Sequence, residues 1–248
     1  RLLCNYAVPS EFRPTKEEIA NEDTSDFKPE ILERLREDPK RFLSEEGLAI
    51  YSPKMLQMIR DIKKNYKQNE EYVNQFVYSQ YRTLEGLGIF GAVLDANGFQ
   101  EYKLVKNQGI WEEDPSMKPG IPAYALFVGG TGEKDKELRE LYRQIFNESY
   151  SDTFPENLKT SIKERRLCIF MASSAGAEGI TLANVRNVYI MEAYWNPARI
   201  EQVIGRGMRT CSHSLLPFEK QNCTVYLHIC RYADSDKETY DEYVYRVF

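Results

Sequence analysis

The residue pattern best suited to chemistry lies between residues 198 and 209. If this segment is helical, Gln202, Arg206 and Arg209 occupy positions i, i+4 and i+7 and share one face. Two guanidinium groups on one face are seldom buried without anionic partners, and the planar donor fork of arginine fits phosphoryl oxygens. A glycine on each side of Arg206 leaves room for close approach. The pattern predicts arginines that contact a phosphate chain, and the alternative is a solvated helix with two surface arginines.

A second candidate segment, Ser173-Ser-Ala-Gly-Ala-Glu-Gly-Ile-Thr-Leu182, is rich in small residues and follows an apolar run that predicts a buried strand. A loop of small residues can present its backbone N–H groups to an anion or to a nucleic-acid backbone. A tight turn between a strand and a helix would have the same composition. The segment alone does not decide between these two interpretations.

A complete site for a nucleoside triphosphate would need residues that this sequence lacks. The chain contains no G-x-x-x-x-G-K-[ST] phosphate loop and no Asp-Glu-x-His/Asp box. Without such a loop and its lysine, the β- and γ-phosphates and Mg²⁺ have no cradle. We therefore expect that this chain does not hydrolyse ATP unaided.

Short apolar runs alternate with segments of helical spacing from residue 51 onward. Runs that are apolar almost throughout are typical of strands buried on both faces, and their alternation with helices predicts an α/β fold with a parallel sheet. The predicted strands are 75–79, 124–128, 167–172, 188–191 and 224–229, and the predicted helices are 83–94, 133–146 and 198–208. Ligands of such sheets bind at the carboxyl ends of the strands, which selects the loops 79–81, 129–132 and 173–179 and the segment after Met191.

Three regions are distinguished along the chain. Residues 1–50 are polar, acidic and interrupted by prolines, which indicates a linker or accessory segment. Residues 51–232 hold the α/β pattern, which starts at the capping pair Ser52-Pro53 and is interrupted by a loop insertion at about 96–122. Residues 233–248 form a tyrosine-rich tail, for which we expect an amphipathic helix, with base stacking as the alternative. The chain lacks an initiator methionine, so we expect it to derive from a longer protein.

Composition and charge argue against several classes of protein. The 248 residues carry a formal net charge of −5, whereas a stand-alone nucleic-acid-binding module would usually be basic. No apolar run approaches the roughly 20 residues that span a bilayer, and no signal peptide is recognisable. Five cysteines at irregular spacing argue against a disulfide framework and for a reducing compartment. We expect an intracellular protein with no membrane partner.

Cysteine and histidine residues near the C-terminus are of metal-ligating types. Cys211 and His213 form a C-x-H pair, His228 and Cys230 form an H-x-C pair, and Cys223 lies between them. These spacings differ from the C-x₂₋₄-C and H-x₃₋₅-H pairs of common structural zinc sites. We therefore expect ordinary packed residues here and no metal site.

The order of the candidate segments resembles that of superfamily 2 helicases. Gln202-Val-Ile-Gly-Arg-Gly-Met-Arg209 resembles motif VI, whose pattern is Q-x-x-G-R-x-x-R, and Ala175-Gly-Ala-Glu-Gly-Ile-Thr-Leu182 resembles motif V of the Swi/Snf-like branch. Residues 187–197 are similar to the segment ending in Trp-Asn-Pro that joins these motifs, and residues 76–81 resemble motif IV. Each motif alone is weak evidence for the resemblance. Four motifs in the same order as in these helicases, over about residues 50–232, are specific evidence for it.

The resemblance implies a RecA-like parallel sheet with helices on both faces, in the C-terminal half of an ATP-dependent DNA/RNA helicase or translocase. Arg206 and Arg209 would be arginine fingers that reach ATP, with Gln202 supporting the phosphate end. ATP and Mg²⁺ would be held mainly by a partner, the N-terminal RecA-like domain of the same protein. The residues bordering the nucleotide would be Gly176, Glu178, Gly179 and Gly205. The residues along the nucleic-acid backbone would be Ser79, Gln80, Gly129, Gly130, Thr131, Ser173 and Ser174.

Residues 201–217 resemble the helicases of large cytoplasmic DNA viruses, of the poxvirus nucleoside triphosphatase I and early transcription factor type. This narrower resemblance implies DNA in preference to RNA, the transcription machinery as a candidate partner, and the host cytoplasm or the virion as location. Two other functions stay open. One is a double-strand DNA translocase or transcription-termination ATPase without unwinding, and the other is a RecA-like module that only scaffolds other proteins.

Overall fold

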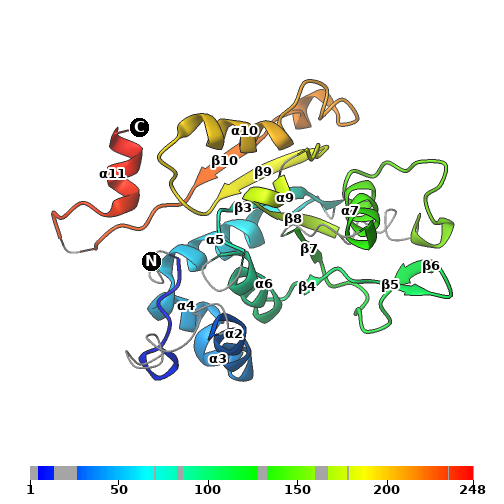
Figure 1. The fold of residues 1–248 in the computed structure, drawn as a ribbon. Helices are drawn as coiled ribbons and strands as arrows, with labels where there is room; N and C mark the ends of the chain where they lie inside the picture. The colour runs from blue at the N-terminus through cyan, green and yellow to red at the C-terminus, as the bar shows by residue number, and fades with distance from the viewer. Residues whose placement is uncertain are drawn as a thin grey trace.

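A computed structural model describes residues 5–13, 27–69, 71–82, 86–127, 133–159, 167–177, 179–233 and 235–247. Six parallel strands form its central sheet (Figure 1). In spatial order the strands are β10 (Thr224–Leu227), β9 (Val185–Ile190), β3 (Asn74–Ser79), β8 (Leu167–Ser173), β7 (Ala123–Phe127) and β4 (Gln100–Glu101). Every neighbouring pair is parallel, which confirms the predicted α/β class. β3 and β8 are buried along their whole length. β8 is apolar almost throughout, as is typical of a strand buried on both faces, whereas β3 also buries Asn74, Gln75 and Ser79.

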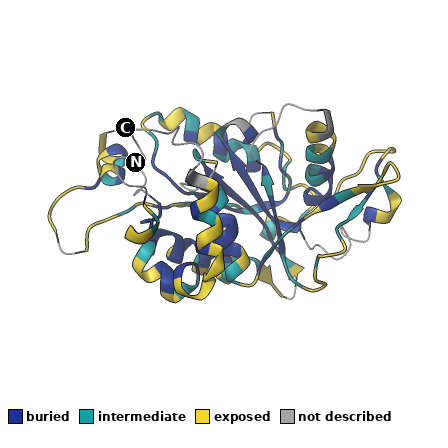
Figure 2. Cartoon of the chain, turned by 60° about the horizontal axis from the view of Figure 1, so that its bottom comes forward, coloured by how far each residue is buried: buried dark blue, intermediate teal, exposed yellow. Residues whose placement is uncertain are grey.

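Helices cover both faces of this sheet (Figures 1 and 2). On one face, apolar side chains of the sheet pack against α2 (Phe27–Glu37), α3 (Pro39–Phe42), α4 (Glu45–Tyr51), α5 (Pro53–Asn65) and α6 (Leu87–Ala96). On the other face they pack against α7 (Glu133–Phe146) and α10 (Pro197–Gly207). Figure 2 shows the strands buried between these layers, with the exposed residues on the outer sides of the helices. The predicted parallel sheet with helices on both faces is thus confirmed.

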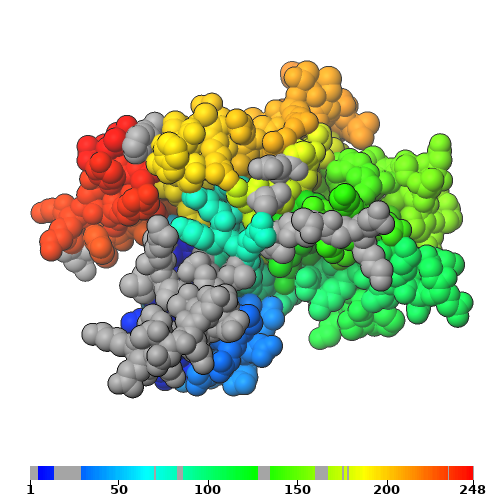
Figure 3. Space-filling model, in the orientation of Figure 1, coloured from blue at the N-terminus to red at the C-terminus, as the bar shows by residue number. Residues whose placement is uncertain are grey.

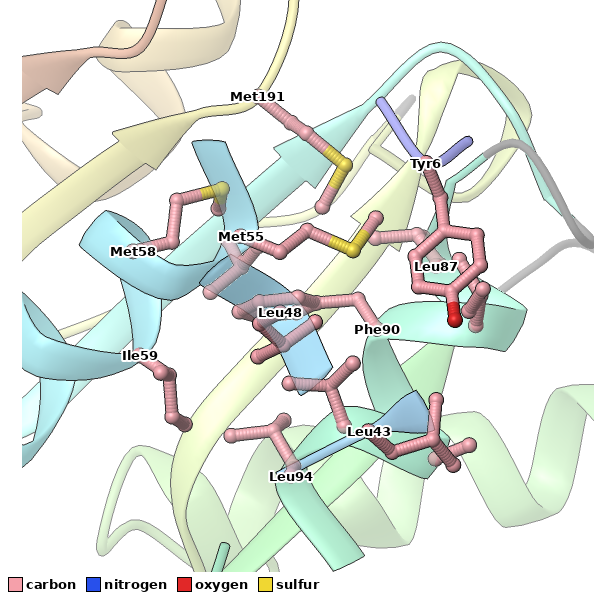
Figure 4. Close-up of a cluster of buried hydrophobic side chains, with 14 of the residues drawn as sticks. Tyr6, Leu43, Leu48, Met55, Met58, Ile59, Leu87, Phe90, Leu94 and Met191 are labelled. Atoms are coloured by element: carbon pink, nitrogen blue, oxygen red, sulfur yellow. The ribbon is translucent and has the colours of Figure 1, made fainter. Parts of the chain in front are cut away.

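The helix predicted after the Ser52-Pro53 pair is present as α5. The Ser52 hydroxyl accepts a hydrogen bond from the backbone N–H of Met55 at 3.1 Å, and Pro53 occupies the first helical position. Apolar residues then recur on one side and enter the first core cluster, together with residues of α4 and α6 (Figure 4). The capped start and the apolar stripe fix the helix against the sheet.

The described part of residues 1–50 packs as an integral element, which favours the accessory alternative over a linker. Tyr6 and Leu35 belong to the first core cluster, and the Tyr6 hydroxyl donates to the Phe42 carbonyl at 3.1 Å. The backbone N–H of Ala7 donates to the carbonyl of Tyr51 at 2.7 Å. The physical reason is that a few well-spaced apolar residues suffice to anchor a segment whose other residues are polar. η1 (Ser10–Phe12) also lies in this region.

The predicted loop insertion at 96–122 contains strands. β4 extends the sheet beside β7, and β5 (Leu104–Asn107) pairs with β6 (Ile110–Glu113) as an antiparallel hairpin. The hairpin turn places Gln108 and Gly109 at positive φ, and Trp111, close to the turn, is buried. Sequence periodicity missed this hairpin because each strand has only four residues, two apolar and two polar. A further short pair is β1 (Lys67–Gln68) with β2 (Glu71–Tyr72).

The tail at 233–248 ends in a helix, α11 (Tyr240–Val247), as expected. Asp241 and Val244 are buried, whereas Tyr240 and Tyr243 are exposed. The amphipathic helix is therefore confirmed, and base stacking stays an alternative use of its exposed face. Three short elements complete the description: η2 (Glu156–Leu158) precedes β8, α9 (Ser174–Ala177) follows β8, and η3 (Phe218–Lys220) precedes β10. Within the described residues no helix is long and apolar enough to cross a membrane.

Candidate functional site

The carboxyl ends of three central strands bring the predicted site loops together. β3 lies between β9 and β8, so Ser79, Ser173 and the segment after Ile190 meet at one edge of the sheet. This juxtaposition is what a parallel sheet predicts. Gly129, Gly130 and Thr131, which follow β7, lie outside the described residues. Three of the four predicted loops can therefore be examined.

A surface pocket opens where the ends of β3 and β8 face α10. α10 supplies most of its lining, and α9 closes one side. Figure 3 shows the surface of α10, in yellow, beside the cyan surface near the end of β3. Among the described residues its lining includes no carboxylate, so the pocket offers donors for an anion but no ligand for Mg²⁺. The lining residues are Tyr78, Ser174, Ala177, Asn196, Ala198, Arg199, Gln202, Val203 and Arg206.

The local sequence determines how α10 presents its polar face. Asn196 caps the helix by accepting a hydrogen bond from the N–H of Ala198 at 3.1 Å, and Pro197 occupies the first position. Ile200 and Val203 are buried in the second core cluster. With these apolar residues turned toward the sheet, the polar residues at intervening positions are left at the pocket and at the surface.

Gln202 and Arg206 lie together in the pocket, as the helical spacing predicts. Arg206 is half-buried and Gln202 is exposed. Within the described part of the chain, neither side chain has a hydrogen bond or an ion pair. A guanidinium group without a counter-ion at the mouth of a pocket is available to an external anion. This arrangement suits a phosphate chain supplied from outside the domain.

Arg209 does not share the face predicted for it. α10 ends at Gly207, so Arg209 lies beyond the helix, and its Nη1 donates to the Thr181 hydroxyl at 2.7 Å. The last helical residue, Gly207, packs against Val185, where an added Cβ would lie 3.1 Å from a methyl carbon. Arg209 is exposed and does not line the pocket in this conformation.

The small-residue segment is hydrogen-bonded at three points to α10 and to the residues that follow it. The backbone N–H of Leu182 donates to the Arg206 carbonyl at 3.0 Å. Arg209 binds the hydroxyl of Thr181, and Arg199 donates a hydrogen bond to the hydroxyl of Ser174. These contacts connect the two segments predicted to do chemistry. A shift of one segment must therefore act on the other.

The predicted glycines of this site differ in their structural roles. An added Cβ at Gly176 would lie 2.0 Å from the carbonyl oxygen of Phe127, so this position requires a glycine. Gly179 has a φ of +77°, in the left-handed region that favours glycine. An added Cβ at Gly205 would have no atom within 4 Å, so the fold does not require a glycine at this position. Glu178 lies outside the described residues.

Replacement of Gly176 and of Gly205 by alanine should therefore have opposite effects on stability. Gly176→Ala is expected to lower the unfolding midpoint, because its methyl group collides with the backbone of β7. Gly205→Ala should raise the free energy of unfolding by up to about 1 kcal/mol, because alanine favours a helix more than glycine does. Urea unfolding of both variants measures this, and equal midpoints would contradict the assigned backbone approach.

Ser79 and Gln80, predicted to face nucleic acid, bind instead to a buried carboxylate. The Ser79 hydroxyl donates to Glu192 Oε1 at 2.5 Å, and the N–H of Gln80 donates to Oε2 at 3.0 Å. The side chains of Ser79 and Ser173 are fully buried, so they present no surface to a ligand here. Gln80 remains partly exposed, with its amide donating to the Ala193 carbonyl at 3.3 Å.

Sequence reasoning missed the buried polar network around Glu192. Asn5 Nδ2 also donates to Glu192, at 2.5 Å. Lys54 donates to Asn5 at 3.3 Å, to the Met191 carbonyl at 3.2 Å and to Asp241 at 2.7 Å. The available signal was a glutamate directly after an apolar strand, because a charged residue at such a position needs buried partners. The network ties both ends of the chain to the edge of the sheet that carries the site.

Burial raises the pKa of Glu192 to about 7, although the hydrogen bonds from Ser79, Gln80 and Asn5 and the charge of Lys54 oppose that rise. The folded protein therefore binds this proton more tightly than the unfolded chain, whose value is near 4.5. The stability that this proton contributes is fully present at pH values below the pKa of Glu192 in the unfolded chain. It is lost as the pH rises to the pKa of Glu192 in the folded protein. We expect the urea midpoint to fall between about pH 5 and about pH 7.

Glu192→Gln provides the comparison for this pH dependence. The variant cannot ionise, so its urea midpoint should change less over the same interval than that of the native protein. Identical slopes for both proteins would show that Glu192 does not titrate as described. The difference between the two curves, rather than either curve alone, is the measured quantity.

The histidines and cysteines of metal-ligating types have other partners. His228 Nε2 lies 3.3 Å from Asp61 Oδ2, and burial lowers its pKa. His213 Nε2 lies 2.6 Å from the Val185 carbonyl oxygen. Cys211, Cys223 and Cys230 are free thiols. Among the described residues no group of three or more His, Cys, Asp or Glu side chains could hold a metal ion.

Comparison with known proteins identifies the part of the chain that holds this site. Residues 147–211 match the model of the helicase conserved C-terminal domain. This segment of the chain is similar to helicase C-terminal domains. The matched residues include the small-residue segment, β9, α10 and Arg209, so the expected resemblance of these segments to helicases is confirmed. The RecA-like class of the sheet agrees with this match.

Its relatives come from large DNA viruses, as expected. One, from Acanthamoeba polyphaga mimivirus and named as an ATP-dependent RNA helicase, is 28% identical and covers 77% of this chain and 29% of the relative. Nucleoside triphosphatase I of Melanoplus sanguinipes entomopoxvirus is 33% identical over 44% of this chain and 16% of the relative. The termination factor NPH-I homolog of African swine fever virus is 27% identical and covers 79% of this chain and 28% of the relative. The chain thus spans less than a third of each relative.

Proposed function

We propose that this helicase C-terminal domain is the second half of an ATP-dependent nucleic-acid helicase or translocase. The observation that carries the proposal is the pair Gln202 and Arg206, which line a pocket without a partner among the described residues. Arg206 acts as an arginine finger on ATP held by an N-terminal RecA-like domain. Such a finger stabilises the charge that develops on the transferred phosphoryl group.

Arg209 joins Arg206 as a second finger in the closed motor. Its present hydroxyl partner, Thr181, is uncharged, and a neutral partner gives way to a phosphate more readily than a carboxylate would. Gln202 supports the phosphate end. Closure of the two domains brings these side chains to the nucleotide, whose other borders are Gly176, Glu178, Gly179 and Gly205.

ATP and Mg²⁺ are held mainly by the N-terminal domain in this proposal. The pocket supplies guanidinium, amide and hydroxyl groups, which fit phosphoryl oxygens, whereas its described lining has no carboxylate for Mg²⁺. Mg²⁺ would neutralise charge on the β- and γ-phosphates where the other domain binds it. The residues of this chain therefore orient and stabilise rather than bind the metal.

The nucleic-acid track runs along the same edge of the sheet. Gln80 and Ser174 are partly exposed there and contact backbone phosphates without reading sequence. Ser79 and Ser173 lie beneath and position the loops that carry these contacts. Gly129, Gly130 and Thr131 continue the track after β7. DNA is the preferred strand, and the location is the host cytoplasm or the virion, with transcription machinery as a partner.

The segment 174–182 transmits movement between the two ligands. Two of its hydrogen bonds lie at the nucleotide end, from Leu182 to Arg206 of α10 and from Arg209, just beyond α10, to Thr181. The contact between Arg199 and Ser174 lies at the track end. A change in the nucleotide that moves α10 therefore shifts the track residues. Repeated closure and opening drives steps along the strand.

A second candidate is a double-strand DNA translocase or transcription-termination ATPase that does not unwind. The observation that favours it is the similarity to nucleoside triphosphatase I and to a termination factor homolog. A strand-displacement assay on the longer protein that contains this domain tests the choice. A helicase releases the labelled strand when ATP is present. ATP hydrolysis on duplex DNA without strand release supports the translocase instead.

A further inference from the structure

Arg199 is a third pocket residue that lies outside the recognised Q-x-x-G-R-x-x-R pattern. It occupies the first turn of α10, three residues before Gln202 and seven before Arg206. All three side chains line the same pocket. Seven residues of helix span about 10 Å, so the Arg199 and Arg206 ends of the pocket are about two turns apart. The pocket can therefore serve two separate anionic groups.

The positive charge of Arg199 is not compensated by a carboxylate among the described residues of the pocket. Its guanidinium donates to the Tyr194 hydroxyl at 3.0 Å and to the hydroxyl of Ser174. The Cζ atom of Arg199 also lies 5.0 Å from the centre of the Tyr194 ring. These neutral partners fix the orientation of the guanidinium but leave its charge free for an anion.

Tyr78 lies at the same end of the pocket. Its side chain, at the end of β3, is 1% exposed and lines the pocket. Burial raises the pKa of Tyr78, and the charge of Arg199 and hydrogen bonds with Ser174 and Arg199 oppose that rise. The Tyr78 and Ser174 hydroxyls and the Arg199 guanidinium therefore form one cluster of hydrogen-bond donors, which can turn to an anion in the pocket.

We propose that Arg199, Tyr78 and Ser174 form a subsite for one phosphodiester group of the nucleic-acid strand. The inference rests on the proposed function and adds Arg199 and Tyr78 to the track. The subsite lies at the Ser174 end of the pocket, away from Arg206, and its donors are a charged fork and two hydroxyls. This set recognises a phosphate by charge and hydrogen bonds and carries no base specificity.

Binding of a labelled single-stranded DNA oligonucleotide to the longer protein, without nucleotide and over a range of salt concentrations, tests the subsite. Arg199→Ala should weaken binding and reduce the slope of log K against log salt by about 1, as the loss of one phosphate contact requires. Tyr78→Phe should weaken binding about 3- to 10-fold, the expected effect of one hydrogen bond. The melting temperature of each variant is measured as well, so that a loss of binding is separated from a loss of the folded state.

Two controls separate a ligand contact from a structural effect. Arg199→Lys keeps the charge, so the salt slope should stay native while the affinity falls. Arg186→Ala removes a half-buried arginine that binds Asn222 at the other end of β9, and it should change neither quantity.

Native affinity and slope in both Arg199→Ala and Tyr78→Phe would overturn the proposal. A raised KM for ATP with unchanged DNA affinity would also overturn it, because the pocket would then hold the nucleotide at both ends. Binding is measured without hydrolysis, so failure of this subsite is distinguishable from failure of Arg206 as a finger.

Discussion

Arg206→Ala is expected to lower the kcat for ATP hydrolysis of the longer protein by about 10³ or more. The guanidinium group of Arg206 has no partner among the described residues, so its removal leaves the folded domain without an unsatisfied group. The loss falls on the transition state, where an arginine fork neutralises developing charge. Steady-state hydrolysis at saturating ATP and nucleic acid measures the effect, and the KM for ATP should change much less than kcat.

Two variants give this measurement its controls. Arg206→Lys keeps the positive charge but loses the planar fork, so its kcat should lie between those of the native protein and the alanine variant. Arg186→Ala alters a half-buried arginine that does not line the pocket and should leave kcat unchanged. An unchanged kcat in Arg206→Ala would favour a domain that only scaffolds other proteins.

Asp241→Ala is expected to lower the free energy of unfolding by about 3–5 kcal/mol, the range for removing one partner of a buried ion pair. The side chains of Lys54 and Asp241 are 2% and 7% exposed and lie 2.7 Å apart. Removal of the carboxylate leaves the Lys54 ammonium buried, with two remaining oxygen partners and no counter-ion at that distance. It also releases the N–H of Cys230, which Asp241 holds at 2.8 Å. Urea unfolding at neutral pH measures the change.

The double variant Lys54→Met, Asp241→Leu is the matched control, because it removes both charges and keeps comparable volume. Its loss of stability should be clearly smaller than that of Asp241→Ala. Glu238→Ala, which breaks the exposed pair with Arg246 in the same part of the chain, should have little effect. An unfolding curve of Asp241→Ala that coincides with the native curve would show that the buried pair does not anchor α11.

The central sheet could be predicted from the sequence because burial on both faces leaves a direct trace. The runs predicted at 75–79 and 167–172 became β3 and β8, with boundaries shifted by one residue. The N-terminal helices and the hairpin of β5 and β6 left no such trace. The N-terminal residues are mostly polar, and each hairpin strand has only two apolar residues. The position of both regions depends on a few contacts with distant parts of the chain, such as that of Tyr6 with Phe42.

The site was predictable where one helix carries it and less so where several segments meet. The spacing of Gln202 and Arg206 on α10 was sufficient to place both in the pocket. Arg209 was misplaced because the helix ends at the packing contact of Gly207. Glu192 and its partners were missed because Asn5 lies 187 residues away, and no local pattern reports such a contact.

ATP turnover by separate and joined domains tests the central claim most directly. Hydrolysis would be measured for this chain alone, for the N-terminal RecA-like domain alone, and for the longer protein that contains both, each with nucleic acid. If Arg206 acts on a nucleotide held by the other domain, turnover at the full rate occurs in the joined protein alone and is lost in its Arg206→Ala variant. Turnover by this chain alone, or full turnover in the joined Arg206→Ala variant, would contradict the account.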